Sequence, residues 1–73
     1  MKTLADDLPN QIKRVQEKRE RWLSMAREYP SMNVGPACAV MKMEIDAAID
    51  ALASGDVARM LAANASLYGF DDD

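Results

Sequence analysis

The feature that most constrains the fold is a series of mainly apolar positions that recur every three or four residues between two prolines. This seam consists of Leu8, Ile12, Val15, Arg19, Trp22, Ala26 and Tyr29. The spacing places all seven positions on one face of an α-helix, and no alternating strand pattern fits them. Pro9 is favoured at the start of a helix, and the residue before Pro30 is disfavoured in helical conformation. The sequence therefore predicts a helix over residues 9–29.

Two shorter helices are predicted in the remainder of the chain. After Pro36, the positions Cys38, Met41, Ile45, Ala48 and Leu52 again step by three and four. Gly55 ends this second helix, because glycine readily adopts the left-handed conformation that follows a helix. Asp56 or Ser54 then caps a third helix. The predicted inward face of the third helix comprises Val57, Met60, Leu61, Asn64 and Leu67 or Tyr68. The helices are thus expected over residues 36–53 and 56–68, with an acidic tail at residues 71–73.

The 73 residues are expected to form one small all-α domain, 1–73. A short connection lets the first two helices fold back as an antiparallel helical hairpin, with the short third helix beside it. Of the 36 apolar residues 12 are alanine, which leaves a small core for a stable monomer. We therefore expect a homodimer in which two hairpins complete a four-helix-like bundle. The expected core and dimer residues are Ile12, Val15, Met41, Ile45 and Leu52.

The composition argues against catalysis and against a bound cofactor or metal. One cysteine and no histidine cannot provide an internal disulfide, a zinc site of the usual ligands or a histidine-activated nucleophile. Asp46 and Asp50 share a helical face and would suit a carboxylate pair, but Lys42 lies with them on the face expected to be solvated. Cys38 is expected to be a reduced, buried thiol. We therefore expect a protein that is not an enzyme.

The charge is unevenly divided between the two halves of the chain. Residues 1–29 carry a net charge of +2, and residues 30–73 carry −5. This division favours antiparallel pairing of a basic first helix with acidic ones. The basic residues of the first helix alternate with glutamates and not with aromatic residues, so no nucleic-acid partner is expected. No signal-peptide pattern and no membrane-spanning stretch occur, so we expect a cytoplasmic protein without a membrane partner.

The end of the first helix is the predicted partner-binding surface. Its residues are Arg19, Arg21, Trp22, Tyr29 and Met32. Arg19 either packs its stem while the guanidinium reaches water, or it pairs with Asp46 or Asp50 across an interface. Trp22 is either the largest core side chain or an interface anchor. Tyr29 either covers the end of the core or belongs to an apolar tip at the loop.

Three short segments resemble small helical accessory proteins of temperate phages. They are Leu8-Pro9-Asn10-Gln11-Ile12 with Arg14-Val15, Ala53-Ser54-Gly55-Asp56-Val57 with Met60, and Leu67-Tyr68-Gly69-Phe70. Some proteins of this kind act on the host by binding one of its proteins. Examples are anti-CRISPR proteins and anti-quorum-sensing proteins that bind a transcriptional regulator and a pilus ATPase. The resemblance implies a phage-encoded modulator in the host cytoplasm, and it assigns no catalytic or binding residue.

Three functions follow as hypotheses from these patterns. The first is a protein-binding module that inhibits or modulates a host protein by steric occlusion, such as a transcriptional regulator, a motility ATPase or a defence complex. The second is an oligomer that sequesters a small ligand, for example a cyclic nucleotide, with arginine and tyrosine from its interface. The third is a purely structural oligomer. The first is preferred, because the surplus apolar surface and the arginines of the first helix suit a protein partner.

Overall fold

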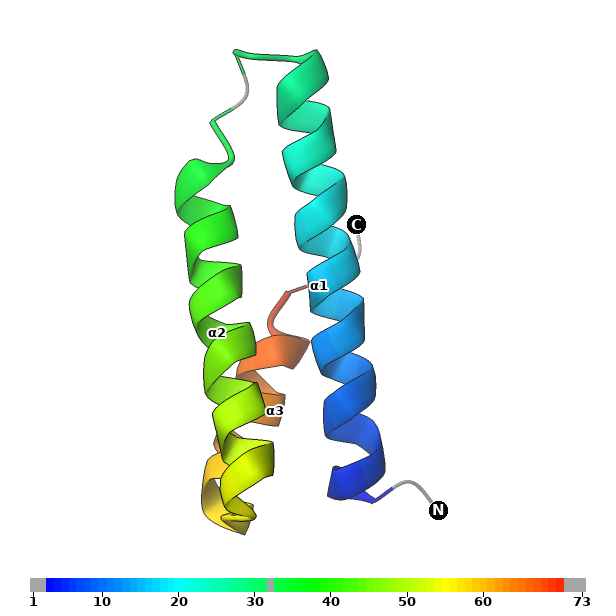
Figure 1. Cartoon of the computed structure of the whole chain (residues 1–73), viewed down its shortest axis with the longest axis vertical. Coiled ribbons are helices and arrows are strands. Elements are labelled where there is room, and N and C mark those ends of the chain that lie inside the picture. Colours follow the sequence, from blue (N-terminus) through cyan, green and yellow to red (C-terminus); the bar gives the residue numbers. More distant parts are fainter. Residues whose placement is uncertain (1–2, 32, 71–73) are drawn as a thin grey trace.

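The computed structural model of the chain describes residues 3–31 and 33–70, and this part consists of three α-helices joined by short connections. They are α1 (Leu4–Glu28), α2 (Gly35–Ser54) and α3 (Val57–Tyr68). α1 and α2 lie side by side and run in opposite directions, and α3 packs against one end of the α1–α2 pair (Figure 1). No strand occurs among the described residues. The prediction of an all-α chain with three helices is confirmed.

The predicted start of α1 at Pro9 is wrong, because the helix begins at Leu4. Thr3 caps it: the threonine hydroxyl accepts a hydrogen bond from the Asp6 backbone N–H at 3.2 Å and donates one to the Asp6 carboxylate at 2.9 Å. A reciprocal cap with acidic residues in the first turn is a strong helix start. Pro9 therefore lies inside α1. Because Pro9 and Ala5 are both exposed, water can serve the carbonyl group that loses its donor.

The other helix ends lie within one residue of their predicted positions. Gly55 ends α2 in the left-handed conformation, with φ of 70°. Asp56 caps α3, since its carboxylate accepts hydrogen bonds from the backbone N–H groups of Ala58 at 3.0 Å and Arg59 at 3.3 Å. Ser54, the alternative cap, instead donates its hydroxyl to a carbonyl of α2 at 2.8 Å. The turn between α2 and α3 is therefore tightly defined.

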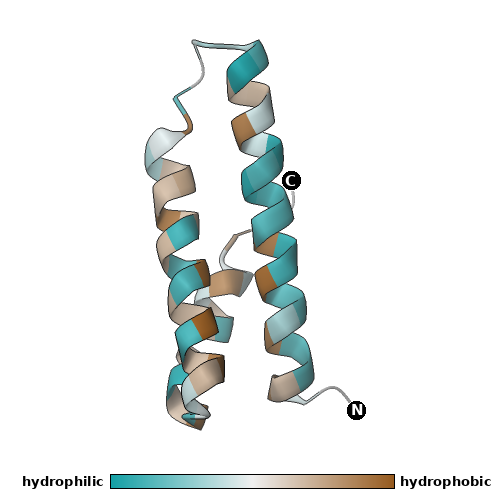
Figure 2. Ribbon diagram, in the orientation of Figure 1, coloured by the Kyte–Doolittle hydropathy of each residue, from teal (hydrophilic) through white to brown (hydrophobic). Residues whose placement is uncertain are grey.

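The hydrophobic core lies where the three helices meet. Its buried residues are Leu8, Ile12, Val15, Met41, Ile45, Ala48, Ala51, Met60, Ala63 and Leu67. Four of the five expected core residues belong to this cluster, and the fifth, Leu52, is partly buried and packs against it. Figure 2 shows that α1 is mainly hydrophilic with a few hydrophobic bands, whereas α2 carries more apolar surface. Among the described residues, no helix combines the length and apolar character needed to cross a bilayer.

The buried face of α3 agrees with the predicted one at Met60 and Leu67 and differs from it elsewhere. Met60, Ala63 and Leu67 are buried, whereas Val57, Leu61 and Tyr68 are more than half exposed. The prediction followed the bulkiest side chains. The observed face instead includes a small residue, Ala63, where α3 faces the alanines of α2. Close packing of two helix backbones selects small side chains at the contact, and hydropathy alone does not reveal this.

Candidate functional site

α3 packs against both α1 and α2, but it covers only part of their length. The guanidinium group of Arg14 marks where α3 ends, because it donates hydrogen bonds to the carbonyl oxygens of Leu67, at 2.7 Å, and Phe70. α1 continues from Arg14 to Glu28, about 21 Å at 1.5 Å per residue. We call the part beneath α3 the covered end. We call the part beyond it the open end, and its residues are Trp22, Met25, Tyr29, Ala37 and Val40.

The open end presents apolar side chains to solvent. The exposed fractions are 41% for Met25, 60% for Tyr29 and 46% for Val40, while Trp22 is partly buried against the core. On α1, Trp22, Met25 and Tyr29 lie on the same helical face that contacts α3 nearer the N-terminus of the helix. On α2, Ala37 and Val40 likewise extend the α3-facing side, one to two turns beyond α3. The open end is therefore the exposed continuation of the faces of α1 and α2 against which α3 packs.

Lys18 lies at the boundary between the covered and open ends. Its side chain is 5% exposed, and its Nζ lies 5.4 Å from the centroid of the Trp22 ring. A cation at this distance is attracted to the face of an indole ring. The sequence pattern placed Arg19 in the apolar seam, but the basic residue buried there is its neighbour Lys18. Trp22 is thus both a partial core residue and the first aromatic residue of the open end.

Arg19 connects α1 to α2 instead of reaching an aspartate. Its Nε donates a hydrogen bond to the carbonyl oxygen of Cys38 at 3.0 Å. Of the two acceptors predicted for an interface, Asp46 is paired with Lys42 at 2.9 Å, and both aspartates are exposed on α2. Cys38 is buried and its thiol is free, as expected. Arg19 therefore stabilises the α1–α2 pair within one chain.

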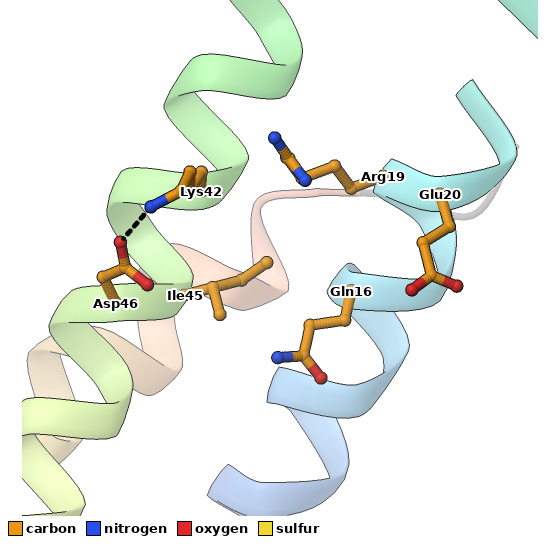
Figure 3. A pocket seen from close by; sticks show the side chains of 6 residues that line it. All are labelled: Gln16, Arg19, Glu20, Lys42, Ile45 and Asp46. Atoms are coloured by element: carbon orange, nitrogen blue, oxygen red, sulfur yellow. Dashed lines mark hydrogen bonds and ion pairs between the residues drawn. The ribbon is translucent and has the colours of Figure 1, made fainter. Parts of the chain in front are cut away.

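A hollow of about 330 Å³ lies beside Arg19 on the front of the α1–α2 pair. Its lining residues are Gln16, Arg19, Glu20, Lys42, Ile45 and Asp46. Figure 3 shows Arg19 reaching from α1 toward α2, and the Lys42–Asp46 ion pair lying along α2. Ligand pockets are usually lined mainly by apolar groups. Only Ile45 is apolar here, and Arg19 and Lys42 both already contact acceptors, so the hollow does not favour an anionic ligand.

A polar cluster fixes α3 to the start of α1. One carboxylate oxygen of Asp7 accepts hydrogen bonds from the Asn64 amide at 3.2 Å and the Tyr68 hydroxyl at 2.7 Å. The hydrogen bond to Asp7 raises the pKa of Tyr68 above its ordinary value of 10.0, and burial and the charge of Asp7 act in the same direction. No spacing in the sequence reveals this cluster, because Asp7 is more than fifty residues away from its partners. The cluster stabilises the covered end.

The structure separates the five residues predicted to bind a partner. Trp22 and Tyr29 lie together at the open end, and Arg21 is exposed on the adjoining side of α1, next to Met25. Arg19 contacts α2, and Met32 lies outside the described residues. Sequence reasoning did not place Met25 and Val40 in the surface. The spacing from Trp22 to Met25 to Tyr29 was the available signal for Met25.

Comparison with protein-family models, with curated proteins and with solved structures finds no match to this chain. In residues 3–31 and 33–70, no three side chains of the His, Cys, Asp and Glu types are grouped to hold a metal ion. The candidate site is therefore defined by geometry, as an exposed apolar surface that α3 does not cover.

Proposed function

We propose that this chain is a non-enzymatic protein-binding module that associates with other protein chains through the open end. The observation that carries the proposal is that Met25, Tyr29 and Val40 are exposed and Trp22 is only partly buried, on faces of α1 and α2 that α3 leaves uncovered. Amphipathic helices commonly bind in apolar grooves between helices. Tryptophan and tyrosine are also the residues that most often anchor protein interfaces. The open end therefore suits a helical partner.

Steric occlusion is the mode of action that this surface supports. Its side chains supply contact area, and binding there covers the partner's own surface. The expected homodimer, in which two helical hairpins complete a four-helix-like bundle, would have to form through the open end, because its expected core and dimer residues already belong to or pack against the core of one chain. The more specific proposal of a phage-encoded inhibitor or modulator of a host protein is supported by the resemblance of three short segments alone.

Copurification with matched variants tests the proposal. The double variant Met25→Lys/Tyr29→Lys places charge on the open end, and Leu61→Lys places it on an equally exposed apolar position of α3. In quantitative mass spectrometry after capture from the native cells, we expect a partner retained by the wild type and by Leu61→Lys. The double variant should lose it, because two charges oppose apolar contact. A partner retained by the double variant would contradict the assignment of the open end.

A further inference from the structure

We propose that the open end binds a second copy of this chain, with α1 antiparallel to α1 of that copy. This inference rests on the proposed function, because it names the occupant of the same surface. On α1 the residues of this face are Trp22, Met25 and Tyr29, preceded by the buried Lys18, and the four step by four, three and four. This is the spacing of a coiled-coil seam, in which Trp22 and Tyr29 take position a and Lys18 and Met25 take position d.

The charges beside this seam favour the antiparallel orientation. Arg21 and Glu28 are both exposed and both immediately precede a seam residue, so both take position g. In an antiparallel pair g faces g. In the register that places Trp22 of one copy opposite Met25 of the other, Arg21 of the first copy and Glu28 of the second are offset along the helices by two residues, about 3 Å. Their long side chains span that offset, and the five donors of a guanidinium can serve more than one acceptor.

A parallel orientation lacks this complementarity. There position g faces position e, so Arg21 would lie opposite Ala26, which joins a charge to a methyl group. The two-fold related antiparallel arrangement instead forms the Arg21–Glu28 pair twice, once on each side of the axis.

The position of α3 also selects the antiparallel arrangement. In the register that pairs Trp22 with Met25, Glu28 of the second copy lies opposite position 19. That is five residues, or about 8 Å, beyond Arg14, where α3 ends. The α1 helix of the second copy, which ends at Glu28, therefore stops short of the end of α3. A two-fold axis parallel to the helices would instead place the α3 helices of both copies on the same side and in the same space.

The surface available for this contact is small. The overlap is about ten residues of α1 and the adjoining end of α2. A contact of this size is at the low end of specific protein interfaces. We therefore expect a concentration-dependent equilibrium between monomer and dimer.

Sedimentation equilibrium at low ionic strength tests the arrangement, because salt screens exposed charge pairs. Glu28→Arg places two arginines opposite each other at both ends of the seam, and Arg21→Glu places two glutamates there. We expect each single reversal to raise the dimer dissociation constant about tenfold or more. The double variant Arg21→Glu/Glu28→Arg should restore it to within about threefold of the wild type, because the pairs are re-formed with reversed sign.

Asp50→Arg is the matched control. It changes the net charge of the chain by the same amount as Glu28→Arg, but on the exposed side of α2. It should leave the dissociation constant unchanged, and circular dichroism should show that every variant keeps its helices. A wild type that stays monomeric overturns the self-association and leaves the copurification experiment to judge the proposed function. A dimer that resists Glu28→Arg, or that the double variant does not restore, overturns the antiparallel register.

Discussion

The covered and open ends are built from the same two helices and the same spacing of apolar residues, yet they differ in burial. At the covered end Leu8 and Val15 of α1 are fully buried, and Leu67 of α3 closes the core above them. At the open end Met25 and Tyr29 continue the face that turns toward α3 and are 41% and 60% exposed. α3 has 12 residues and α1 has 25, so the third helix ends well before α1 does. Whether an apolar residue of α1 is buried therefore depends on whether α3 lies over it, and not on the spacing of apolar residues in α1 alone.

The largest expected difference between the ends concerns deletion of apolar side chains. Leu67→Ala should lower the free energy of unfolding by about 2–5 kcal/mol, because it removes a fully buried side chain and leaves a cavity. Met25→Ala should lower it by less than about 1 kcal/mol in the monomer, since the side chain is partly hydrated already. Urea unfolding followed by circular dichroism at low protein concentration measures both. Equal losses would show that the open end is as well packed as the covered end.

The second prediction concerns the Arg14 contact that marks where the two ends meet. Arg14→Met keeps a long apolar stem but removes the hydrogen bonds to the Leu67 and Phe70 carbonyl groups. We expect a loss of about 1–3 kcal/mol, because bonds from a charged donor to helix-end carbonyls are strong and partly buried here. Hydrogen exchange should show faster exchange in α3 than in α2. Lys13→Met, at an exposed neighbouring position, should change stability by less than about 0.5 kcal/mol.

The smallest expected effect is at the Tyr68 hydroxyl, which belongs to the covered end. In a Tyr29→Phe background, ultraviolet absorbance should report a pKa for Tyr68 above 10.0, and Asp7→Asn should lower it toward that value. The native state holds this proton more tightly than the unfolded chain. The associated stability is therefore complete below pH 10 and is lost as the pH rises through the raised pKa. An Asp7→Asn protein with an unchanged Tyr68 titration would remove Asp7 as the cause.

Local signals in the sequence were sufficient for most helix ends. Pro36, Gly55 and Asp56 act through their own backbone or cap geometry, so their positions could be read directly. The start of α1 is different from the predicted one because the capping pair of Thr3 and Asp6 begins the helix at Leu4, before the start that Pro9 favours. Both signals are local, and the structure shows that a good cap can extend a helix through an exposed proline.

Contacts between distant segments could not be read in the same way. Arg14 meets the last turn of α3, and Asp7 meets Tyr68, only because the helices assemble around a common core. The choice between Lys18 and Arg19 as the buried basic residue depends on how α1 faces its neighbours, since adjacent residues lie at the two edges of one seam. Trp22 and Tyr29 were predicted at the partner surface because aromatic residues mark interfaces. Val40 was missed because its exposure depends on the length of α3.

The elongated shape that follows from a short α3 affects how the molecule diffuses. The Cα radius of gyration is 13.3 Å and the principal extents are 40 × 22 × 16 Å. A compact domain of 73 residues would have a radius of gyration of about 11 Å. An elongated particle meets more friction than a sphere of equal mass, so the monomer will elute from a sizing column ahead of a globular standard of 8.1 kDa. Its apparent size will mimic partial dimerisation, and the association state must be read from light scattering or sedimentation equilibrium.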